Sequence, residues 1–194
     1  MWWARLLNSI VAFLDSGVAA STSAYASIAT ITVGSGGAAS IDFTSIPSTY
    51  THLQIRGIAR DARASAQDSL NIKYNNDSGN NYMQYHELYA DGSTAASYAG
   101  STSGAFMSLD RIAGNTAGAS MFGAVIIDIL DYANTNKYKT QKWLGGTDQN
   151  GSGIMAFGSG LWMSTSAINQ ITLTGASANF SQYSSFALYG IKGA

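Results

Sequence analysis

The stretch THLQIRGIA (residues 51–59) alternates between apolar and polar side chains. In an extended chain, one face carries the apolar and small residues at positions 53, 55, 57 and 59. The opposite face carries a mostly polar set: His52, Gln54, Arg56, Ile58 and Arg60. This period of two predicts an antiparallel β-strand with one face in the core and the other half in water.

Similar short segments lie on both sides of this stretch, separated by clusters of Gly, Asn, Asp and Ser. We expect about ten strands, at residues 26–33, from 41 onward, and at 51–59, 70–74, 82–90, 105–109, 121–130, 138–144, 154–157, 168–174 and 184–191. The segment at 125–130 is the most hydrophobic and is expected to be central, with Asp128 either at an edge or satisfied in the interior. The spacing predicts an all-β fold, an antiparallel β-sandwich of jelly-roll type.

One turn cluster, Asn-Asn-Asp-Ser-Gly-Asn at residues 75–80, offers oxygen atoms that a calcium ion would accept. It holds a single carboxylate, Asp77, and lacks the distal bidentate glutamate of a helix-loop-helix calcium site. We interpret it as a hairpin turn.

Composition excludes several functional classes. Only 11% of the 194 residues are charged, against about 25% in an average soluble domain. The net charge of -1 provides no basic surface for nucleic acid. Cysteine is absent, which excludes disulfides and thiolate chemistry. We therefore expect stability to come from packing or from assembly with other chains.

The sequence shows no catalytic constellation, and we expect neither an enzyme nor a cofactor. Glu87 is the single glutamate, and its neighbour His86 points to the opposite face of the same predicted strand. Two histidines without cysteine make a zinc site improbable, and no metal is expected. The candidates for an interface or a glycan contact are one histidine and four aromatic residues: His52, Tyr82, Tyr85, Tyr138 and Trp143.

The N-terminal segment has a different pattern from the rest of the chain. Its apolar residues follow the three-and-four spacing of a helical stripe, and Gly17 is a natural stop. The expected anchoring residues are Trp2, Trp3, Leu6, Leu7, Ile10 and Leu14. The segment is too short and too polar to insert across a membrane. We divide the chain into a helix with its connector (1–24) and a β-domain (25–194). We expect the helix to pack on its own domain, on copies of itself, or on a partner.

Five ordered strings resemble a family of β-rich structural proteins of tailed bacteriophages, including phages of aquatic bacteria. They are IATITVGSGG (28–37), FTSIPSTYTHLQIR (43–56), DYANTNKYKT (131–140), GLWMSTSAIN (160–169) and SSFALYGIKG (184–193). The resemblance covers the chain from residue 25 to the C-terminus. It implies a location on the virion exterior, at the capsid surface or alternatively on the tail, and a homotrimer.

The leading hypothesis from this resemblance is a capsid decoration, or cement, protein bound to the major capsid protein. The N-terminal segment would insert into a groove of the shell or between trimer mates. An alternative is a short tail fibre or adaptor bound to a tail protein, with the loops at 75–85 or 131–138 at a tip away from the anchor. A carbohydrate-binding module is a third, weaker hypothesis.

Overall fold

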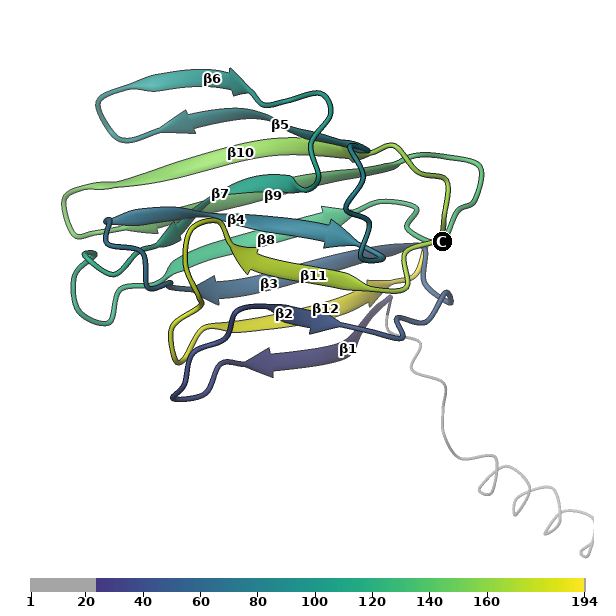
Figure 1. The fold of residues 1–194 in the computed structure, drawn as a ribbon, viewed down its shortest axis with the longest axis horizontal. Helices are drawn as coiled ribbons and strands as arrows, with labels where there is room; N and C mark the ends of the chain where they lie inside the picture. The colour runs from purple at the N-terminus through teal and green to yellow at the C-terminus, as the bar shows by residue number, and fades with distance from the viewer. Residues whose placement is uncertain (1–23, 194) are drawn as a thin grey trace, which may run out of the picture.

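The computed structural model describes residues 24–193, whose regular secondary structure is entirely β-strand. Figure 1 shows these strands running roughly side by side. The twelve strands of the described residues are β1 (Tyr25–Thr32), β2 (Ile41–Phe43), β3 (His52–Ala59), β4 (Gln67–Tyr74), β5 (Tyr82–Ala90), β6 (Ala95–Ala99), β7 (Met107–Ala113), β8 (Gly123–Ile129), β9 (Lys139–Asp148), β10 (Gly153–Trp162), β11 (Ile171–Gly175) and β12 (Ser185–Ile191).

The strands form two antiparallel sheets packed face to face. The large sheet has eight strands in the order β1-β12-β3-β8-β9-β10-β5-β6, and the small sheet has four in the order β2-β11-β4-β7. In Figure 1 the small sheet lies over the middle of the large one. The expected all-β sandwich is therefore confirmed, and the hydrophobic stretch at 125–130 provides most of β8, the fourth of the eight strands.

Strand pairing is nested along the chain. β3 pairs with β12, β4 with β11, and β5 with β10. The first and third of these pairs lie in the large sheet and the second lies in the small sheet. The segments β3–β5 and β10–β12 thus run antiparallel to each other and change layers together, from the large sheet to the small one and back.

The core lies between the sheets and is built by the inward faces of alternating strands. On β3, Leu53 and Ile55 are fully buried while Arg56 is exposed, as the alternation in the sequence predicts. Asp128 lies on the opposite, outward side of β8, half-buried, and accepts a hydrogen bond from Gln54. It is neither at a sheet edge nor in the interior, because β8 is central and residue 128 alternates with the buried Ile127 and Ile129.

One local expectation is corrected by the topology, and one strand had no predicted counterpart. The cluster at 75–80 is not a hairpin turn, because β4 and β5 lie in different sheets and the loop crosses between them. Asp77 fixes this crossing by accepting hydrogen bonds from the Trp162 indole N–H at 2.7 Å and from Asn81 at 3.0 Å. The strand without a predicted counterpart is β6, because its mostly exposed residues show no apolar alternation.

The expected N-terminal helix lies outside the described residues, and so do its six anchoring residues. Within residues 24–193 there is no helix with the length and apolar character needed to cross a membrane.

Candidate binding face of the large sheet

The large sheet has one face in the core and one face turned away from the small sheet, which we call the outer face. Neighbouring strands are in register there, so that side chains of five strands form rows across the sheet. One row, which we call the apolar row, joins four large hydrophobic side chains: Ile126 on β8, Leu144 on β9, Phe157 on β10 and Leu88 on β5.

The apolar row is open to solvent in the described chain. Leu88 is 62% exposed, Phe157 50% and Leu144 44%. Met155, 59% exposed, extends the apolar surface toward the β9–β10 hairpin. Large hydrophobic side chains scattered singly on a surface are ordinary, but a contiguous set marks an interaction site.

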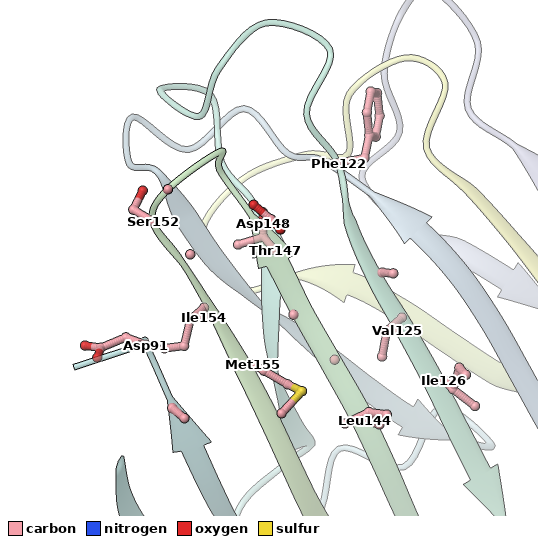
Figure 2. A pocket seen from close by; sticks show the side chains of 17 residues that line it. Asp91, Phe122, Val125, Ile126, Leu144, Thr147, Asp148, Ser152, Ile154 and Met155 are labelled. Carbon is pink, nitrogen blue, oxygen red and sulfur yellow. The ribbon is translucent and has the colours of Figure 1, made fainter. Parts of the chain in front are cut away.

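A groove of about 730 Å³ adjoins the apolar row at the hairpin end of the sheet. Figure 2 shows Ile126, Leu144 and Met155 on three neighbouring strands along it, with Asp148 near its upper end. Gly146 contributes no side chain between Ala124 and Met155, its cross-strand neighbours. The absent side chain at Gly146 leaves a hollow at the centre of the groove, which is lined by apolar residues there and has Asp148 at one end.

The next row across the outer face, on the side of the apolar row away from the groove, is polar. It consists of Gln54, Asp128, Lys142, Ser159 and His86 on five adjacent strands. Gln54 donates to Asp128 at 2.6 Å and accepts from Arg56 Nε at 2.9 Å. The first bond joins β3 to β8 and the second runs along β3, so Gln54 links Asp128 to Arg56.

Two tyrosines in ring contact, tilted by 36°, end this polar row at the β1 edge. The rings of Tyr25 and Tyr189 are 4.9 Å apart, and the Arg56 guanidinium lies 5.6 Å from the centroid of the Tyr25 ring. The Tyr25 hydroxyl donates a hydrogen bond to Gln54. Partial burial raises the pKa of Tyr25 above its usual range, so this hydroxyl stays a neutral donor at physiological pH.

The outer face of the small sheet has the opposite character. Its outward positions on β4 and β11 are polar throughout: Gln67, Ser69, Asn71, Lys73, Thr172 and Thr174. The contrast between the two outer faces shows that the apolar row is not a general property of this charge-poor chain. It is confined to one face, which makes that face the candidate binding surface.

The five surface candidates taken from the sequence do not gather on this face as a group. Tyr82 and Trp143 are buried in the core, which corrects the expectation that they contact a partner or glycan. Trp143 occupies an inward position of β9, and Tyr82 packs on Trp162 with ring centroids 6.3 Å apart. Their residue type alone does not distinguish these buried aromatic residues from aromatic residues on the surface.

The other three candidates lie at or near the surface. Tyr138 is 54% exposed and Tyr85 is half-buried. His52 is also half-buried, and its Nδ1 accepts the backbone N–H of Asp131 at 3.0 Å. Lys137 donates to the Asp131 carboxylate at 2.6 Å and thereby lowers the pKa of Asp131. This histidine therefore holds the loop after β8 in place.

Residues 24–193 contain no group of three or more His, Cys, Asp or Glu side chains that could hold a metal ion, Asp110 left aside. His86 is exposed on the outer face, whereas Glu87 is buried on the inner side. The expected separation of these two neighbours onto opposite faces is thus confirmed.

Sequence signals for the outer face are present in three strands, β8, β10 and β5. The run at 125–127 is continuously apolar, a pattern typical of a strand that is covered on both sides. Phe157 and Leu88 are apolar residues at positions that alternate with buried ones. The register that brings these residues into one row is set by the whole sheet and is not visible in any single strand.

No protein-family model matches the chain, and no curated protein matches it. Among solved structures, galectin LEC-6 of Caenorhabditis elegans is similar, with 8% identity and a TM-score of 0.31 over 84% of this chain and 96% of that chain. A sialidase carbohydrate-binding module (CBM40) of Ruminococcus gnavus, in a structure with bound α2,3-sialyllactose, has 12% identity and a TM-score of 0.32 over 84% and 91%. These similarities are too slight to support any statement about function.

Proposed function

We propose that this chain is a non-catalytic structural protein of a tailed-bacteriophage virion, a decoration protein that binds the outer shell as a trimer through its jelly-roll-like β-sandwich. The observation that carries the proposal is the exposed apolar row on the outer face. A shell protein surface of matching shape would bury this row, and burial of apolar area is the main driving force of protein association.

The resemblance to phage structural proteins supports this proposal from the sequence side, since its five strings span the β-domain from residue 28 to residue 193. The nested pairing of β3 with β12, β4 with β11 and β5 with β10 supports the jelly-roll-like description. In the decoration role, binding free energy holds neighbouring shell subunits together and no chemical step is needed.

The positions of two loops favour this role over that of a tail fibre. A fibre with its anchor at the N-terminus would present the loops at 75–81 and 131–138 far from the start of β1. Tyr25 pairs with Ile191, which pairs with His52, and His52 contacts the loop at Asp131. The loop at 131–138 thus lies at the same end of the sandwich as the start of β1, and Figure 1 shows the connection from β4 to β5 toward that end as well, on the right.

Cosedimentation of the full chain with shells that lack it tests the proposal. We expect Phe157→Asp to weaken shell binding by about tenfold or more, because a charge at the centre of an apolar interface must be desolvated without a partner. The matched control is Thr174→Asp, which adds the same charge on the polar outer face of the small sheet. Equal binding by both variants would contradict the assignment of the face.

A further inference from the structure

The apolar row presents a surface that no described residue covers, although its sequence has the pattern of a covered one. Leu88, Leu144 and Phe157 are each more than two-fifths exposed, and β8 has apolar side chains on both of its faces at residues 125–127. A contiguous apolar face marks an interaction site, and the chain itself contains one candidate occupant outside the described residues.

The candidate is the segment of residues 2–14, whose apolar residues form one stripe at helical spacing. A helix of that length measures about 20 Å at about 1.5 Å per residue. The apolar row with its neighbour Arg56 spans five strands, from β3 to β5, which is about 19 Å at about 4.8 Å per strand. The four residues of the apolar row alone span about 14 Å, so the apolar stripe covers the whole row and reaches Arg56 at its end.

The connector reaches the row with length to spare. Tyr25 begins β1 with its side chain on the outer face, where it contacts Gln54. Cross-strand pairing aligns Ile126 with Arg56, Ala187 and finally Thr30 on β1, three strands away. Thr30 lies five residues along β1 from Tyr25. The diagonal distance from Tyr25 to Ile126 is therefore about 22 Å. Residues 15–24 extend over as much as about 33 Å.

We infer that residues 2–14 of the free protein dock on the apolar row of their own large sheet. Tethering favours this intramolecular arrangement over docking on a second copy, because a connector that matches the span gives an effective concentration in the millimolar range. Single-copy docking therefore dominates at micromolar protein concentration. The inference concerns the free protein and goes beyond the proposed function: the face must be uncovered before a shell can bind it.

Cysteine cross-linking in the full chain tests this inference, and the natural absence of cysteine gives a clean background. One cysteine replaces Leu6, Leu7 or Ile10 in turn, and the second replaces Leu144. The control pairs carry the second cysteine at Thr174, on the outer face of the small sheet. Leu144 and Thr174 are both at outward positions of strands, so we expect the cysteine variants to fold. Thermal unfolding of each variant checks that the fold is retained.

We expect at least one Leu144 pair to form a disulfide within one chain about tenfold faster than the matching Thr174 pair, as read from intact mass and non-reducing gels. Equal rates for all the pairs would overturn the inference, and so would disulfides found only between chains. Because no shell is present, a negative result leaves the proposed function standing. A failed shell-binding experiment likewise leaves the docking result unaffected.

Discussion

Two buried aspartates, Asp61 and Asp68, form a pair that shares one proton. Asp68 accepts hydrogen bonds from Arg63 Nη1 at 2.6 Å and from the Ser177 N–H at 2.9 Å. Asp61 Oδ2 is buried and has no donor directed at it. Burial, followed by the interaction with Asp68, raises the pKa of Asp61 to about 7, so below that pH Asp61 is protonated and neutral beside Asp68.

This pair predicts that stability falls as pH rises from about 4 to about 7. The pKa of Asp61 is about 7 in the folded chain and about 3.9 in the unfolded chain. The folded state therefore binds more protons in this window, and its stabilisation is complete below the lower value and lost above the upper one. In urea unfolding, the midpoint of the wild type should be lower at pH 8 than at pH 5.

The variant Asp61→Asn should remove most of this difference, because an amide stays a neutral donor at both pH values. Asp42→Asn is the control, since Asp42 is exposed on β2 and should leave the wild-type pH dependence in place. An Asp61→Asn variant that retains the full difference between pH 5 and pH 8 would contradict the shared proton.

At the scale of single strands, Gly146 lets β9 and β10 approach closely beside the groove. A Cβ added at this residue would lie 2.6 Å from the backbone oxygen of Ile154 on the partner strand. That overlap cannot be relieved by a side-chain rotation, so the hairpin itself must shift. Gly34 is the opposite case, because a Cβ there meets nothing within 4 Å.

We therefore expect Gly146→Ala to lower the free energy of unfolding by about 1–3 kcal/mol, the usual cost of overpacking. Gly34→Ala should leave stability unchanged or raise it by up to about 1 kcal/mol, because the unfolded chain loses freedom. Denaturant unfolding of the two variants measures both values. If both alanines had the same effect, the close approach of the two strands would not be a constraint.

Element-scale features also divide into those that the sequence predicts and those that it does not. The alternation at residues 51–59 predicted both faces of β3, because a period of two depends only on local geometry. The turn residues at 75–80 predict a hairpin wrongly, because they carry no information about which sheet the next strand joins. Trp143 was placed on the surface because its burial depends on the facing sheet.

For the whole molecule, the outer face could not be predicted from the sequence, because it depends on the pairing of five strands from distant parts of the chain. The row of Ile126, Leu144, Phe157 and Leu88 exists only once β8, β9, β10 and β5 are in register. The proposed role follows from this assembled surface and from the resemblance of the five strings. Neither the composition nor any single motif leads to it.

The copy number of the protein in purified virions, measured by quantitative mass spectrometry against the major capsid protein, tests the central claim most directly. The account predicts a ratio approaching that of the capsid protein, because only the shell lattice offers so many equivalent sites. A ratio of a few per cent would place the protein on the tail and contradict the decoration role, and its absence from the particle would contradict the virion assignment altogether.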